Sequence, residues 1–97
     1  MPSSTAHVAT ETAARYAKQL ASHLGRKVPV EDLPGDGYRL TFPAGEGVLS
    51  TEADRLIMRA TATDAASLAI VQDVLGRHLE RFGQRNELVV NWQEDVS

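Results

Sequence analysis

The chain has 97 residues, of which 42% are hydrophobic and 24% are charged, and its formal net charge is −3. This length predicts one domain with a single modest core, and the composition argues against disorder. A slightly acidic chain without a long Lys/Arg cluster lacks the positive surface that binds phosphate backbones, so no nucleic-acid partner is expected. The chain has no cysteine, and no apolar stretch approaches the length of a membrane span. We therefore expect a soluble cytoplasmic protein that does not bind a membrane.

The first third of the chain predicts a strand, a helix and a second strand. Residues 4–9 alternate weakly and predict a short strand, and Thr10 follows it as a candidate N-cap of a helix that runs to about residue 24. Gly25 follows this helix, where glycine usually adopts the left-handed conformation. Residues 28–33 predict a strand at a sheet edge, because their proline cannot donate a backbone hydrogen bond.

The rest of the chain predicts three further strands, a long helix and a closing strand. They cover residues 38–42, 48–51, 55–63, 65–83 and 87–92, in that order. Turn signals rich in glycine, proline and aspartate separate the middle strands and indicate antiparallel hairpins, and Thr63 or Asp64 can cap the helix. The prediction is an α+β fold with one domain over 1–97, the order βαββββαβ, and flexible ends at 1–3 and 94–97. Two antiparallel helices should cover one face of a mainly antiparallel sheet whose strand order the sequence does not specify.

Side-chain patterns predict the core and the contact between the helices. The expected core residues are Leu20, Leu24, Tyr38, Leu40, Phe42, Leu56, Met58, Val71, Leu75, Leu79, Phe82 and Val90. Small residues line one flank of each helix, namely Ala14, Ala17 and Ala21 on the first and Ala69, Gly76 and Gly83 on the second. We expect these two flanks to face each other at short distance. His23 and His78 lie on the opposite flanks, so the same geometry predicts that they lie apart, at the outer edges of the helix layer.

His78 is the strongest chemical signal, because it interrupts the apolar face of the second helix. It is either a packed ring at the border of that helix, with one nitrogen hydrogen-bonded, or a ligand-binding group. His78, Arg81, Arg77 and His23 form a candidate site for an anionic or catecholate-like ligand, since guanidinium groups match planar pairs of oxygen atoms. The alternative is that the two arginines only form solvated ion pairs. No zinc-binding spacing of histidines occurs, so neither a metal nor a cofactor is predicted.

The sheet face without helices is the second candidate surface. Arg39, Ile57 and Arg59 should lie on it, in a mixture that is neither as polar as ordinary solvent-facing surface nor as apolar as a core. Such a face often pairs with another chain, so a homodimer or another protein complex is one prediction and a monomer is its alternative. The sequence contains no G-x-S-x-G elbow, no phosphate-binding loop and no conspicuous carboxylate pair. An enzymatic role is therefore not expected.

Three segments resemble a family of short bacterial proteins catalogued as a domain of unknown function. They are ARYAKQLASHLGRK (14–27), LTFPAGEGVL (40–49) and VLGRHLERFGQRNELVVNW (74–92). The resemblance implies an accessory role in siderophore or iron handling, because genes of this kind often lie near genes for siderophore uptake and siderophore-interacting reductases. It makes a ferric siderophore, or such a reductase, the expected partner. It implies no catalytic residue. The alternative is a protein-interaction or homodimerisation module without a small ligand.

Overall fold

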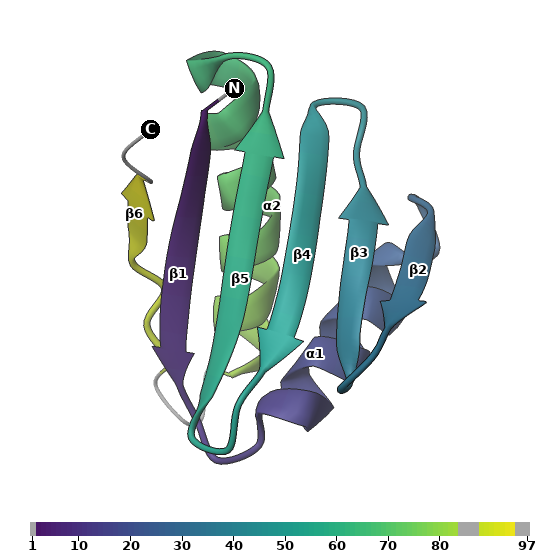
Figure 1. Ribbon diagram of the computed structural model, residues 1–97, viewed down its shortest axis with the longest axis vertical. Coiled ribbons are helices and arrows are strands. Elements are labelled where there is room, and N and C mark those ends of the chain that lie inside the picture. Colours follow the sequence, from purple (N-terminus) through teal and green to yellow (C-terminus); the bar gives the residue numbers. More distant parts are fainter. Residues whose placement is uncertain (1, 84–87, 95–97) are drawn as a thin grey trace.

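Six strands and two helices follow one another along the chain in the order βαββββαβ (Figure 1). The computed structural model describes residues 2–83 and 88–94. The elements are β1 (Ser3–Ala9), α1 (Ala13–Leu24), β2 (Val30–Leu33), β3 (Gly37–Thr41), β4 (Gly45–Thr51), β5 (Arg55–Ala62), α2 (Ala65–Phe82) and β6 (Trp92–Glu94). The predicted α+β class and element order are confirmed.

The strands form a single antiparallel sheet in the order β2-β3-β4-β5-β1-β6. The first strand of the chain therefore lies inside the sheet, between β5 and β6 (Figure 1). Ala6 of β1 is paired with Met58 of β5 on one side and with Trp92 of β6 on the other. Consecutive strands from β2 to β5 pair through short turns, as the hairpin signals predict.

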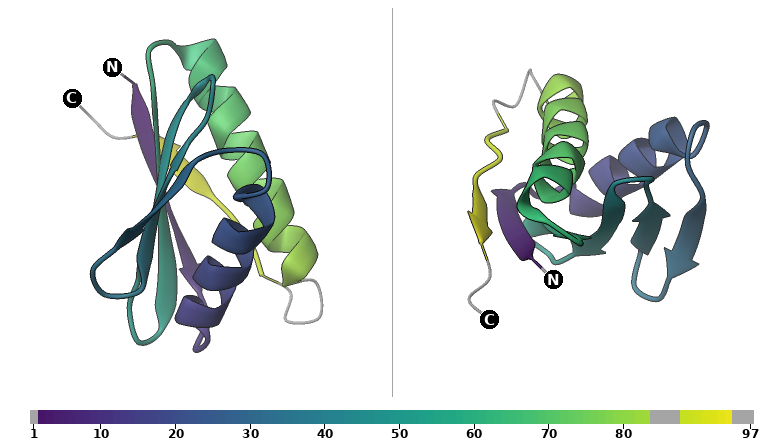
Figure 2. Two further views of the ribbon diagram at one scale, coloured as in Figure 1. Left: turned by 90° about the vertical axis from the view of Figure 1, so that its right-hand side faces the viewer. Right: turned by 90° about the horizontal axis from the view of Figure 1, so that it is seen from above.

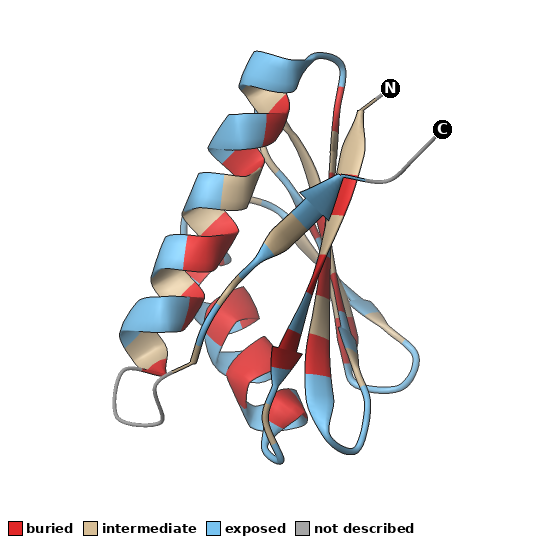
Figure 3. Cartoon of the chain, turned by 90° about the vertical axis from the view of Figure 1, so that its left-hand side faces the viewer, coloured by how far each residue is buried: buried red, intermediate tan, exposed pale blue. Residues whose placement is uncertain are grey.

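Both helices cover the same face of the sheet and are inclined to each other across it (Figure 2). The alternation in β5 explains this arrangement, because every second residue from Leu56 to Ala62 is buried while the residues between them are not. The buried residues lie where the strands and both helices face each other (Figure 3). Within residues 2–83 and 88–94, no helix covers the opposite face of the sheet.

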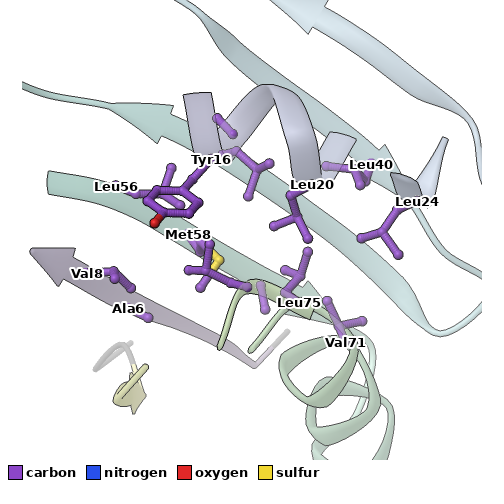
Figure 4. Close-up of a cluster of buried hydrophobic side chains, with 14 of the residues drawn as sticks. Ala6, Val8, Tyr16, Leu20, Leu24, Leu40, Leu56, Met58, Val71 and Leu75 are labelled. Carbon is purple, nitrogen blue, oxygen red and sulfur yellow. The ribbon is translucent and has the colours of Figure 1, made fainter. Parts of the chain in front are cut away.

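The core lies between the helices and the sheet (Figure 4). Of the predicted core residues, Leu20, Leu24, Leu40, Leu56, Met58, Val71, Leu75 and Leu79 are buried, and Tyr38, Phe42, Phe82 and Val90 are partly buried against them. The prediction omitted Leu49, Tyr16 and several alanines, including Ala6 and Ala60, which are also buried. Small alanines at these positions let the helices approach the strands closely.

The ends of the helices differ from the prediction at two points. The helix α1 starts at Ala13 rather than directly after Thr10, whose hydroxyl instead accepts a hydrogen bond from the Thr12 N–H at 3.2 Å. Gly25 has a right-handed φ of −61° and donates its N–H to the Ala21 carbonyl. A Cβ at Gly25 would lie 2.8 Å from that carbonyl oxygen. Glycine is thus required there by a close contact and not by a left-handed turn.

The N-terminus of α2 agrees with the prediction. Asp64 is the N-cap residue, and its Oδ1 accepts a hydrogen bond from the Ser67 N–H at 2.7 Å. This hydrogen bond to the backbone of Ser67 is the main reason why the pKa of Asp64 is lowered from its ordinary value.

The closing strand is shorter than predicted and lies later in the chain. We expected it over 87–92, but β6 covers Trp92–Glu94, residues 88–91 form no strand, and residue 87 lies outside the described part of the chain. Leu88 and Val90 pack against the core instead of pairing with a strand. The apolar character of Leu88 and Val90 therefore reflects contact with α2 and its C-terminal end, at Gly76 and Gly83, and not strand pairing.

The flexibility expected for the chain ends at 1–3 and 94–97 stays a prediction. Ser3 and Glu94 both pair within the sheet, Ser3 with Thr61 and Glu94 with Ser4. The remaining residues of those two ranges are Pro2, which precedes β1, and residues 1 and 95–97, which lie outside the described chain.

The predicted seam between small residues of the two helices is wrong. A Cβ at Gly76 would meet the Trp92 Nε1 atom at 3.3 Å and the Val90 Cγ1 atom at 3.5 Å, so this flank of α2 faces the segment that leads into β6. Ala14 and Ala69 are exposed. The reason is the strand order: β6 lies beyond β1, so α2 has α1 on one side and the returning chain on the other. The glycine flank accommodates the returning chain.

No helix in the described part of the chain is both long enough and apolar enough to cross a membrane.

Candidate functional site

His23 of α1 and His78 of α2 lie together, which contradicts the prediction that they lie apart. Their ring centroids are 5.2 Å apart and their planes are inclined by 45°. The Phe82 ring packs edge-on to His23 at 5.4 Å and lies 6.5 Å from His78. The three rings form a cluster near the C-terminal ends of both helices, which we call the histidine seam.

One nitrogen of His78 is engaged inside its own helix. The Nδ1 atom lies 2.7 Å from the Val74 carbonyl oxygen, and the residue is half-buried. Because a carbonyl only accepts, Nδ1 carries the hydrogen and donates it, which leaves the lone pair of the neutral ring on Nε2. The predicted hydrogen bond at one ring nitrogen is confirmed, but the predicted position at the outer edge of the helix layer is wrong, because the ring faces α1. His23 is exposed in the last turn of α1.

The two predicted arginines do not complete this site. Arg77 forms an ion pair between its Nε and the Asp73 Oδ1 at 2.7 Å, one helical turn earlier. It lines a groove on the flank of α2 that faces Trp92. Arg81 is exposed in the last turn of α2. The four residues of the predicted site are therefore divided between the histidine seam, the opposite flank of α2 and the end of that helix.

A groove runs between α2 and the segment that enters β6, and we call it the α2–β6 groove. Its volume is about 330 Å³, and it is lined by Ala69, Gln72, Asp73, Gly76, Arg77, Glu80, Val90 and Trp92. Gly76 forms part of its wall, where the missing side chain leaves room for the Trp92 indole. Glu80 contacts the other wall, since its Oε2 accepts a hydrogen bond from the Val90 N–H at 3.4 Å. At the base of the helix wall, Gln72 donates a hydrogen bond to the hydroxyl of Ser4, which is buried.

The charges of the groove favour a neutral or cationic ligand. Asp73 and Glu80 contribute two carboxylates, whereas Arg77 contributes one guanidinium that is already paired with Asp73. An anion placed there would have to displace that ion pair and approach the second carboxylate. The sequence interpretation missed Gln72 and Trp92 as lining residues, although Gln72, Gly76 and Glu80 follow one another at helical spacing.

The sheet face without helices carries the predicted interaction residues. Arg39 forms ion pairs with Glu31 at 3.0 Å and with Glu46 at 3.2 Å. Strand pairing places Arg39 opposite Val48, and Val48 opposite Arg59, in one row across the sheet. Ile57 belongs to the neighbouring row and is only half-buried. The apolar side chains of Val48 and Ile57, both half-buried, thus lie beside arginines on this face.

Comparison with known proteins identifies the protein family to which the chain belongs. Residues 5–93 match the family described as "Uncharacterized protein conserved in bacteria (DUF2218)", and the chain belongs to this family. The family resemblance seen in the sequence is thereby confirmed. No curated protein matches the chain.

A solved structure has the same fold. The protein described as "NMR structure of PA4090 from Pseudomonas aeruginosa" is 36% identical, the match covers 96% of each chain, and the TM-score is 0.80. The described architecture is therefore shared with a bacterial relative over nearly its whole length.

Proposed function

We propose that this protein is an accessory small-ligand-binding module in siderophore or iron handling, and that its ligand occupies the α2–β6 groove. The observation that carries the proposal is the groove itself, in which the Trp92 indole lies opposite the polar side chains of Gln72, Arg77 and Glu80. The groove is mainly polar with one aromatic wall, and convergent polar groups of this kind fix the orientation of a small ligand. A volume of about 330 Å³ is at the lower end for such sites, so a siderophore would be held by part of its surface.

The groove favours one class of ferric siderophore over another. In a tris-hydroxamate complex the ligand charges balance iron(III), whereas a tris-catecholate complex remains strongly anionic. Two carboxylates and one paired guanidinium disfavour the anionic complex. We therefore propose a hydroxamate-type siderophore as the ligand of the groove, in place of the catecholate-like ligand expected from the arginines. In this proposal the protein acts in the cytoplasm and passes its ligand to a siderophore-interacting reductase.

Fluorescence of the single tryptophan tests the proposal directly. Trp92 is the only tryptophan of the chain and lines the groove, so a bound ferric complex should quench its emission. We expect saturable quenching by a ferric tris-hydroxamate siderophore and much weaker quenching by a ferric tris-catecholate. The gallium complex, which has the same shape and charge, should shift the Trp92 indole signal in NMR spectra.

A matched pair of variants locates the ligand. Ala69→Phe fills the groove from an exposed position, whereas Ala14→Phe adds the same ring to an exposed position on α1. Saturable quenching should be lost in the first variant and retained in the second. Equal quenching of both variants, or none in the wild-type protein, would refute the assignment of the groove.

The sheet face supports a second candidate function, a homodimerisation or protein-interaction module. The half-buried Ile57, beside a row of arginines on an uncovered face, is the observation that favours it. Light scattering should then give a concentration-dependent mass that Ile57→Asp lowers. Ile70→Asp is the matched control, because Ile70 is an exposed isoleucine on α2. A monomer at all concentrations would exclude the homodimer.

A further inference from the structure

The histidine seam brings together two imidazoles that the proposed ligand groove does not use. Neither His23 nor His78 lines that groove, and their ring centroids are 5.2 Å apart. They come from separate helices and from distant parts of the sequence, so their proximity is a property of the fold. The distance and the tilt of 45° between the ring planes are those of two rings in direct contact.

The spacing of the rings matches two imidazoles that share one metal ion. A ring nitrogen lies about 1.2 Å from its centroid and about 2.1 Å from a bound zinc ion, so each centroid would lie about 3.3 Å from the metal. Two centroids 5.2 Å apart then subtend an angle of about 104° at the ion, close to the tetrahedral value of about 109°. The separation of the rings therefore fits one shared ion when a nitrogen of each ring is turned toward it.

The hydrogen bond of His78 prepares its other nitrogen for this role. Its Nδ1 donates to the Val74 carbonyl at 2.7 Å, which places the lone pair on Nε2 and holds the ring in a fixed orientation. Metal-bound histidines usually donate their second nitrogen to a carbonyl or carboxylate in this way. His23 also lies in the last turn of α1, where the helix dipole favours positive charge.

From these observations we infer that His23 and His78 form a two-histidine chelate for a borderline divalent transition metal such as Zn²⁺, Ni²⁺ or Cu²⁺. The described residues contain no group of three or more histidine, cysteine, aspartate or glutamate side chains that could hold a metal ion. Water therefore completes the coordination, and the site binds metal reversibly rather than permanently. Imidazole ligands select these ions over Mg²⁺ and Ca²⁺, which prefer oxygen ligands. The inference concerns metal alone and does not depend on a siderophore in the α2–β6 groove.

Calorimetry with metal alone tests the chelate. Purified protein freed of metal should bind one Zn²⁺ per chain, and an excess of Mg²⁺ should leave the titration unchanged. Loss of either imidazole should weaken Zn²⁺ binding at least tenfold. His23→Ala is the decisive variant because this side chain is exposed and its removal leaves the core intact. His78→Ala should weaken binding to the same extent, and circular dichroism shows whether each variant is folded.

His7 provides the matched control, because it is an exposed histidine in β1, paired with Ile57. His7→Ala should bind Zn²⁺ like the wild-type protein. Substoichiometric Cu²⁺ should broaden the NMR signals of His23 and His78 and leave those of His7 sharp. The absence of Zn²⁺ binding, unchanged affinity in folded His23→Ala, or broadening centred on His7 would each overturn the inference. None of these outcomes affects the quenching test of the groove.

Discussion

The contact between Gly47 of β4 and Leu75 of α2 sets how closely the long helix approaches the sheet. Both residues are buried, and a Cβ built on Gly47 would lie 2.8 Å from the Leu75 Cδ1 atom. Since carbon atoms in contact normally lie about 3.5–4.0 Å apart, the substitution Gly47→Ala produces an overlap of about 1 Å. Leu75 is fully buried and cannot rotate away into solvent.

The size of the effect follows from two opposing terms. An extra methyl group in a filled core costs about 1–3 kcal/mol, and removing a glycine from a strand recovers about 0.5–1 kcal/mol. We expect Gly47→Ala to lower the free energy of unfolding by about 1–2 kcal/mol. For a domain of this size, that corresponds to a decrease in Tm of roughly 5–15 °C.

Urea denaturation followed by circular dichroism measures this change, and a double-mutant cycle identifies its cause. Leu75→Ala alone should lower the unfolding free energy by about 2–5 kcal/mol, but in the double variant the new methyl group fills part of the cavity. The double variant should therefore be more stable than the sum of the single effects by about 1–2 kcal/mol. Leu79→Ala, at an equally buried position of the same helix, should combine with Gly47→Ala additively. Additivity within about 0.5 kcal/mol for the Gly47–Leu75 pair as well would refute the reasoning.

Three further substitutions test other contacts. Asp64→Ala should destabilise α2 at neutral pH. The hydrogen bond to the helix N-terminus lowers the pKa of Asp64 in the folded protein. The stability that Asp64 adds is therefore fully present above the ordinary aspartate pKa and is lost as the pH falls through the lower folded value. Denaturation curves at a series of acid pH values should show the stabilities of the wild type and the variant converging. Gln72→Leu should lower the unfolding free energy by about 1–3 kcal/mol, because it leaves the buried Ser4 hydroxyl without its partner. Adding Ser4→Ala to the same chain should restore most of this loss, as measured by thermal melts. Arg39→Ala should change stability by less than about 1 kcal/mol, since both of its ion pairs are solvent-exposed, and a larger loss in urea denaturation would show that these pairs act as a coupled network.

Local patterns were sufficient to predict the order of the elements and the face that the helices cover, but not the bounds of β6. The alternation of Leu56, Met58 and Ala60 with polar residues identifies one buried face of β5, and one buried face requires both helices on the same side. Thr63 or Asp64 was predicted as the cap of α2, and the structure selects Asp64, whose side chain acts within a single turn. These predictions depend on residues that are near one another in the sequence, and the structure confirms them.

The arrangement of the helix flanks could not be predicted, because it depends on the position of β6. Sequence periodicity gives the flank on which Gly76 or His78 lies, but not the neighbour of that flank. The strand order places β6 beyond β1, and the segment before β6 occupies the glycine flank of α2. The histidine flank is then left to face α1, so His23 and His78 meet. The same long-range pairing makes Trp92 a wall of the groove, which no local signal around residue 92 indicates.

The position of β1 inside the sheet also determines when the protein can fold during synthesis. Ala6 emerges early from the ribosome, but its partners Met58 and Trp92 belong to strands that are made much later. Until β5 has been synthesised, both edges of β1 lack their partners, and its apolar side chains Ala6 and Val8 have no complete core to enter. Pairings over such distances in the sequence slow folding and prolong the exposure of strand edges. We therefore expect the nascent chain to acquire protease resistance only after α2 and β6 have left the ribosome exit tunnel.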